Sequence, residues 1–148
     1  MKGDPLPTGA HVLRYASPTR AEIPATAFVR SPRDTNGLSV NWREFFSGNL
    51  EEQVASVRQV IRQTLRKNGR FFLINVDAVN AHLAIHAPDV SMGAIEDPLE
   101  AEGGRPADPS HALLTGLPVH DDSPEVERIG DLVAQCIIEP HHSGLVDL

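Results

Sequence analysis

One short run of the sequence limits the possible folds more than any other. Residues 71–74 read Phe-Phe-Leu-Ile, without the alternating polar residues of a strand that has one face in water. An uninterrupted apolar run of this length indicates a strand buried on both faces. We therefore predict a strand at residues 70–76 within a sheet that other elements cover.

Prolines shape the beginning of the chain. Five of the twelve lie within the first 36 residues, which excludes a long helix there and leaves room for short strands, predicted at residues 11–16 and 25–30. Residues 33–37, Arg-Asp-Thr-Asn-Gly, are the strongest turn signal, because the Asn-Gly pair at their end accepts positive φ at little cost. Residues 27–30 and 38–42 are accordingly expected to pair as a hairpin.

A first amphipathic helix is predicted over residues 49–68. Apolar residues recur there at steps of three and four. Asn49 and Glu52 have the spacing of a capping box, and Asn68-Gly69 provides an end signal.

A second amphipathic helix is predicted over residues 124–138. Ser123 is a good N-cap, Pro124 suits the first helical turn, and Pro140 is expected to stop the helix.

The stretch between the two helices is less regular. Residues 77–86 favour a helical turn followed by a strand, and residues 87–110, rich in proline, glycine and acids, are expected to form a long loop.

These elements together predict an α+β fold in a single domain spanning residues 1–148. A small, mostly antiparallel sheet of about five strands would pack against the two amphipathic helices. The predicted strands lie near residues 11–16, 25–30, 38–42, 70–76, and either 83–86 or 111–115.

Charge divides the chain into two unlike halves. Residues 1–74 carry 11 basic and 6 acidic side chains, whereas residues 75–148 carry 2 and 14, so a net charge of +5 is followed by one of −12. Such asymmetry indicates either a charged partner or halves that pack against each other. The isoelectric point near 5.4 disfavours a dedicated nucleic-acid binder.

Other compositional features point to the cytoplasm. No apolar stretch approaches the length needed to cross a membrane, and the chain does not start with an apolar signal segment. The single Cys136 excludes a disulfide within the chain, so nothing indicates an oxidising compartment. We expect neither secretion nor a membrane partner.

The basic side chains include a regular row. Arg58, Arg62 and Arg66 are four residues apart, and Arg70 follows. On a helix the first three would lie side by side and could hold phosphate or an acidic partner. The alternative is a solvated helix face that pairs with the protein's own acids.

Histidines are concentrated in the acidic half. His82 and His86 would lie roughly 6 Å apart on a helix, close enough to share a metal ion, but roughly 13 Å apart on a strand. A structural or surface role for both is the alternative.

A second cluster combines histidine with aspartate. His86 and Asp89 lie at one end of the acidic segment, and Asp108 and His111 lie at the other. If strands 83–86 and 111–115 were neighbours, the four side chains would converge and could bind a divalent metal or act as general acid and base. These residues are also common in ordinary loops.

Asn41 and Trp42 form the last candidate site. A lone tryptophan at a strand end is typically a core anchor under a helix. The alternative is an aromatic wall for a small ligand, with Asn41 as its hydrogen-bonding group.

Two functions follow from these observations. The first is a non-catalytic interaction or accessory protein, which docks to a larger protein partner or to its own copy through its charge-divided surface. The second is a small metal-dependent hydrolase, acting on a phosphodiester, with the His/Asp cluster as its centre, a divalent metal as cofactor and the arginine row as a phosphate holder. Nucleic acid is the less favoured partner.

Overall fold

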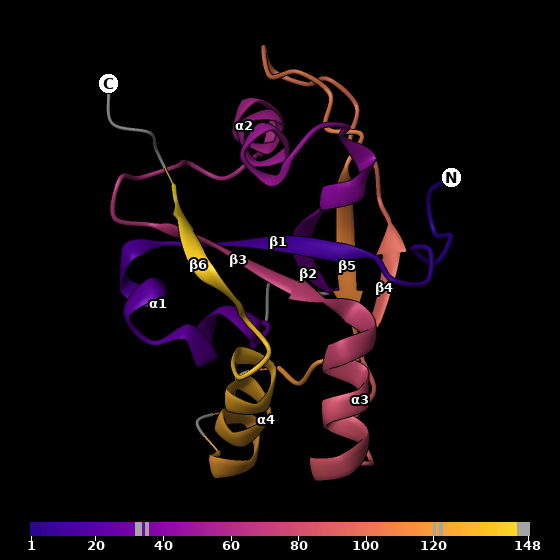
Figure 1. Ribbon diagram of the computed structural model, residues 1–148, viewed down its shortest axis with the longest axis vertical. Helices are drawn as coiled ribbons and strands as arrows, with labels where there is room; N and C mark the ends of the chain where they lie inside the picture. Colours follow the sequence, from indigo (N-terminus) through magenta and orange to yellow (C-terminus); the bar gives the residue numbers. More distant parts are fainter. Residues whose placement is uncertain (32–33, 35, 120, 122, 145–148) are drawn as a thin grey trace.

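The computed structural model describes residues 1–31, 34, 36–119, 121 and 123–144, and its centre is a six-stranded sheet (Figure 1). The strand order is β4-β5-β2-β1-β3-β6, and every neighbouring pair is antiparallel. The strands are β1 (His11–Ala16), β2 (Leu38–Trp42), β3 (Arg70–Asn75), β4 (Gly93–Glu96), β5 (His111–Thr115) and β6 (Ile138–Ser143). The helices are α1 (Pro18–Glu22), α2 (Leu50–Val60), α3 (Val76–His86) and α4 (Pro124–Ala134), with short 3-10 turns η1 (Pro24–Phe28) and η2 (Arg43–Phe45).

Helices cover both faces of this sheet. In Figure 1, α2 lies above the central strands, and α3 and α4 lie below them. Phe72 and Ile74 belong to the larger apolar cluster, which includes side chains of α3, α4 and η1. Phe71 and Leu73 belong to a smaller cluster with Val54 and Val57 of α2. The prediction from the apolar run at residues 71–74 is thus confirmed.

A buried arginine interrupts the apolar pattern of the central strand β1. Arg14 is only 5% exposed, and its guanidinium donates to the carbonyl oxygens of Ala27 and Ser39, at 2.9 Å each. Burial lowers the pKa of Arg14 to about 10, and the nearby positive charge of Arg20 acts in the same direction. The side chain therefore remains charged at neutral pH, and it ties β1 to both η1 and β2.

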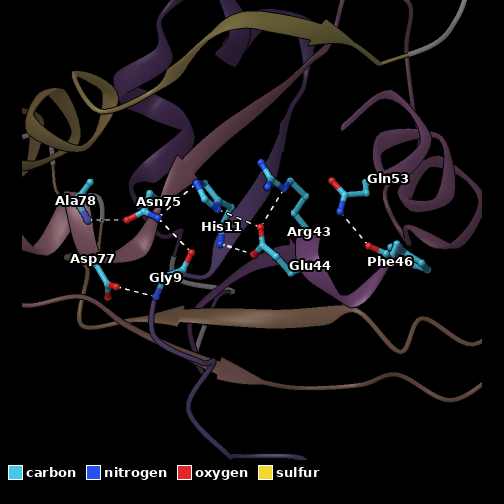
Figure 2. Close-up of polar contacts among 9 residues, drawn as sticks. All are labelled: Gly9, His11, Arg43, Glu44, Phe46, Gln53, Asn75, Asp77 and Ala78. Carbon is cyan, nitrogen blue, oxygen red and sulfur yellow. Dashed lines mark hydrogen bonds and ion pairs between the residues drawn. The ribbon is translucent and has the colours of Figure 1, made fainter. Parts of the chain in front are cut away.

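A group of hydrogen bonds around His11, which we call the polar junction, fixes the start of β1 (Figure 2). Glu44 accepts hydrogen bonds from the backbone N–H of His11 at 2.6 Å and from its ring Nδ1 at 3.0 Å. Asn75 lies on the opposite side of the ring, donates to the carbonyl of Gly9 and caps α3 by accepting from the N–H of Ala78. The junction sets where β1 begins and where α3 leaves β3.

The fold class is confirmed as α+β with an antiparallel sheet, but the sheet has six strands. The strand predicted at residues 25–30 is wrong, because residues 24–28 form the 3-10 turn η1, which begins at Pro24. Its small residues Ala25 and Ala27 allow close packing against α4. The hairpin of 27–30 with 38–42 is also wrong, since β2 pairs with β1 and β5. The expected turn falls partly on residues 33 and 35, outside the described ranges.

The first amphipathic helix is shorter than predicted. The capping box of Asn49 and Glu52 is present, but α2 ends at Val60, where Ile61 turns to an extended conformation (φ −62°, ψ 141°). The guanidinium of Arg62 binds the carbonyl of Val60 at 3.1 Å and thereby satisfies one of the terminal carbonyls of the helix. Gly69 is therefore not a helix cap.

The middle of the chain is more regular than predicted. Residues 76–86 form one continuous helix, α3, so the strand at 83–86 is wrong. The expected loop at 87–110 contains β4 and continues as a twisted antiparallel hairpin, with isolated bridges of Leu99 with Asp108 and of Glu102 with Arg105. We call residues 97–110 the arm.

The second predicted helix is also too long at its end. Ser123 caps α4 and Pro124 begins it, as expected, but the helix ends at Ala134. Residues 138–143, including Pro140, form the edge strand β6 beside β3. Pro140 is tolerated there because an edge strand has unpaired N–H positions.

Replacing Gly130 with alanine tests the packing of α4 against η1. A Cβ at this position would lie 2.6 Å from the carbonyl oxygen of Ala25, a backbone atom that cannot rotate away. Although alanine normally favours a helix by about 1 kcal/mol, we expect Gly130→Ala to lower the free energy of unfolding by about 1–3 kcal/mol, measured by urea denaturation. Glu127→Ala, at an exposed position of the same helix, should change it little, and a stabilised Gly130→Ala variant would contradict the packing.

Candidate functional site

The candidate site lies where the arm leaves the sheet, over β2 and β5. Strand alternation sends Leu38 and Val40 into the larger apolar cluster and leaves Ser39 and Asn41 on the opposite face. In the register of the two strands Asn41 is opposite His111. Three of the residues singled out from the sequence, Asn41, Asp108 and His111, meet here.

Asp108 is a fully buried carboxylate whose hydrogen bonds all come from neutral donors. The side-chain amide of Asn41 lies 3.1 and 2.9 Å from its two oxygens. Ser110 adds its hydroxyl at 2.8 Å and its backbone N–H at 3.2 Å. Since an unpaired buried carboxylate is strongly unfavourable, these bonds fix β2, β5 and the arm relative to one another.

A second network beside Asp108 has the geometry of a proton relay. The ring Nδ1 of His111 lies 2.9 Å from the carbonyl oxygen of Asp97 and 3.1 Å from its carboxylate. Both neighbours are acceptors, so Nδ1 carries a proton. In the neutral ring Nε2 then accepts from the hydroxyl of Ser39, 3.1 Å away. Ser39 is half-buried, and His111 is 9% exposed.

The arm is clamped to the end of α2. Arg62 donates to the carbonyls of Glu100 at 2.8 Å and Pro106 at 2.7 Å, which lie on the two sides of the arm. In return, the guanidinium of Arg105 donates to the carbonyl of Arg62. Arg62 thus supports the arm and the helix end together, a role that no local sequence pattern predicts.

Beyond the clamp the arm extends into solvent. Residues 100–107 are all exposed, and the turn at the tip is formed by Gly103 and Gly104, with φ of 58° and 80°. Figure 1 shows the arm rising beside α2, away from the sheet. The carboxylates of Glu100 and Glu102 have no hydrogen-bond or ion-pair partner within the described ranges.

The structure does not bring His86 and Asp89 to this site. His86 ends α3, whose far end lies on the opposite side of the sheet from the arm (Figure 1), and its carbonyl accepts from Arg128. Asp89 is exposed in the turn that follows. The convergence predicted from the sequence required a strand at 83–86, and that segment is helical.

His82 and His86 do lie side by side, as the helical alternative required. Their ring centroids are 4.6 Å apart, and Nε2 of His82 lies 2.8 Å from the side-chain oxygen of Gln135, which directly follows α4. Across the part of the chain that the structure describes, no group of three or more His, Cys, Asp or Glu side chains is placed to hold a metal ion.

The arginine row is not a helix face. Arg58 alone lies on α2, where it donates to the carbonyl of Ser143 at 2.7 Å and stacks over Phe71. Arg70 donates to the carbonyls of Lys67 and Gly69. Arg66 is exposed, and its guanidinium has no hydrogen-bond or ion-pair partner among residues 1–31, 34, 36–119, 121 and 123–144.

Asn41 and Trp42 do not form a ligand wall. Asn41 is 2% exposed and its amide is bound to Asp108 and Ser110. Trp42 is half-buried and contacts Phe45 edge to face, at 6.1 Å between ring centroids. The partners that sequence reasoning missed are Ser39 and Asp97, which no local motif connects to His111.

Comparisons with known proteins do not identify the site. The sequence matches no protein-family model, and searches among curated proteins and solved structures found no significant match. Within the described ranges, no helix combines the length and apolar character required to cross a bilayer. The site is therefore interpreted from its geometry.

Replacing Asn41 with alanine tests the buried network. The substitution leaves the carboxylate of Asp108 buried without its amide donor, so we expect the free energy of unfolding to fall by about 2–3 kcal/mol. Chemical denaturation followed by circular dichroism measures the change. Asn68→Ala, which removes an exposed amide, should alter stability by less than about 0.5 kcal/mol. Equal stabilities of the two variants would contradict the role given to Asp108.

Proposed function

We propose that the protein is a non-catalytic interaction protein that docks to a basic surface of a larger protein through the tip of the arm. One observation carries the proposal, namely that a hydrogen-bonded hairpin projects from the sheet with two carboxylates that have no hydrogen-bond or ion-pair partner among the described residues. Glu100 and Glu102 lie on its exposed part, residues 100–107. Negative side chains in this position would orient and accelerate association with a positively charged partner.

The construction of the arm supports this proposal. Paired backbone hydrogen bonds join Leu99 with Asp108 and Glu102 with Arg105, at 2.8–3.2 Å. Arg62 binds both sides of the arm. A hairpin that is already ordered loses less conformational entropy on binding than a flexible loop, so more of the contact energy is available for affinity.

The positive charge for docking is better supplied by a partner than by a second copy. The guanidinium groups of Arg58, Arg62 and Arg70 are bound to backbone carbonyls of the same chain. Arg66 is the member of the row that is exposed without a side-chain contact in the described part of the chain. Head-to-tail self-association through the row would have to break the existing contacts.

The docking function is tested with an octalysine peptide as a model basic surface. We expect the double variant Glu100→Gln/Glu102→Gln to associate with the peptide about tenfold more slowly at low salt. Its association rate should also lose most of its dependence on salt. Stopped-flow fluorescence with labelled peptide measures both effects. The control is Glu22→Gln/Asp89→Asn, which removes two exposed acids elsewhere and changes the net charge equally. Equal slowing of both double variants would refute a specific role for the arm.

Oligomeric state provides an independent check. Light scattering after size exclusion, at low and at high salt, should give the mass of a monomer. If a dimer formed at low salt and persisted in Glu100→Gln/Glu102→Gln, the protein's own copy would be the partner and a surface other than the arm would hold it.

The relay geometry favours a second candidate function, hydrolysis with Ser39 as nucleophile. Nε2 of His111 is placed to take the hydroxyl proton of Ser39 while the oxygen attacks an acyl centre, and His111 would return that proton to the leaving group. Asp97 would orient the ring and stabilise its positive charge. Water activated by His111 would then release the acyl group from Ser39.

A fluorophosphonate probe tests this second function. Activated serines react with such probes, so we expect covalent labelling of the wild type, seen as a mass increase on Ser39, and its loss in Ser39→Ala. Labelling should fall at least about tenfold in His111→Asn. The matched control, Ser47→Ala, removes an exposed serine elsewhere and should label normally. An unlabelled wild type, or labelling that survives in Ser39→Ala, would refute the nucleophile.

A further inference from the structure

A positively lined cavity lies at the end of β1, away from the arm. Its volume is about 220 Å³, and it is an open pocket bordered by the end of β1, the start of α1 and the segment after α2. It is lined by Arg14, Tyr15, Ser17, Arg20, Gln63 and Thr64. The lining contains two arginines and no carboxylate, which is unusual in a chain whose net charge is −7.

Arg14 supplies a buried charge to this cavity. Its Nε and Nη1 are bound to carbonyl oxygens, which are neutral acceptors, and Nη2 makes no hydrogen bond to any residue the structure describes. A buried guanidinium is ordinarily paired with a carboxylate or another anion. The acid whose charge acts on Arg14 is Asp34, but its carboxylate is held by the backbone N–H and hydroxyl of Ser31.

Arg20 brings a second positive charge to the same place. It is half-buried, and within the described ranges its guanidinium has no hydrogen-bond or ion-pair partner. Its charge acts unfavourably on Arg14. Two guanidinium groups that repel each other across a cavity would both gain from an anion between them.

Other lining groups can also donate to an anion. Tyr15 is not one of these donors, because strand alternation turns its side chain to the face of the sheet opposite Arg14, where its hydroxyl oxygen accepts from the backbone N–H of Arg66 at 2.8 Å. Ser17 and Thr64 contribute hydroxyls, and Gln63 contributes an amide. An anion with three or four oxygens matches this number of donors better than a halide does.

We propose that this cavity binds a phosphoryl group, either free phosphate or the phosphate of a small metabolite, between Arg14 and Arg20. The site is independent of the docking function, because the arm and its clamp contribute none of the lining residues. It gives the protein a small-molecule ligand in addition to a protein partner.

Inorganic phosphate is the probe for this site. Isothermal titration of the wild type, with sodium chloride used to keep ionic strength constant, should show saturable binding. We expect Arg20→Gln to weaken it by about tenfold to a hundredfold, the effect of losing one charge-assisted hydrogen bond. The guanidinium of Arg20 has no hydrogen-bond or ion-pair partner in the described structure, so the variant should fold normally. Arg66→Gln, which removes an exposed arginine outside the cavity lining, should bind phosphate as the wild type does.

Three outcomes would overturn the proposal. The first is an absence of saturable phosphate binding in the wild type. The second is equal binding by the wild type and Arg20→Gln, as expected if phosphate acts only as a stabilising salt. The third is equally tight, Arg20-dependent binding of acetate, which would assign the cavity to carboxylates. A ribose phosphate that competes with inorganic phosphate would identify the small-metabolite form of the ligand.

Discussion

The buried carboxylate of Asp108 is the point on which the arm and the candidate site depend. Among the residues that the structure describes, no cationic side chain pairs with it; Asn41 and Ser110 provide its side-chain hydrogen bonds, and its backbone pairs with Leu99 in both directions. These contacts join β2, β5 and both sides of the arm. Because a buried charge tolerates little loss of its donors, the geometry at this point is tightly set. The geometry at Asp108 sets the position of the hydrogen bonds made by His111 and the position of the exposed tip of the arm.

Charge is divided along the sequence but interleaved in space. The basic first half supplies the three central strands, β2, β1 and β3, and the acidic second half supplies the strands on both sides of them. Helices of the two halves cover opposite faces of the sheet, α2 on one and α3 and α4 on the other, while η1 of the first half packs against α4 and the arm of the second half lies beside α2. Arg58, Arg62 and Arg70 are partly buried and bound to internal carbonyls, whereas most of the described acids are exposed, including those at the arm tip.

Sequence patterns predicted the elements that local chemistry controls. The run at residues 71–74, the capping box of Asn49 and the start at Ser123 all lie where expected. The predictions fail where contacts between residues far apart in the sequence determine the structure. Arg62 helps to end α2 by binding the arm, some 40 residues away in sequence. The site shows the same division: Asn41, Asp108 and His111 were found as local candidates, but His111 bonds to Ser39, 72 positions away, and no periodicity encodes that contact.

The strand order also has a consequence for how the chain is made. When β3 has been synthesised, the three central strands are present, but the strands that pair with β2 and β3 on their outer sides, β5 and β6, have not yet emerged. Both edges of that nascent sheet are open, and open edges pair readily with other chains. A product that stopped after β3 would be prone to aggregate. The second half of the chain, which is synthesised later, thus covers the open edges and keeps the nascent sheet from pairing with other chains.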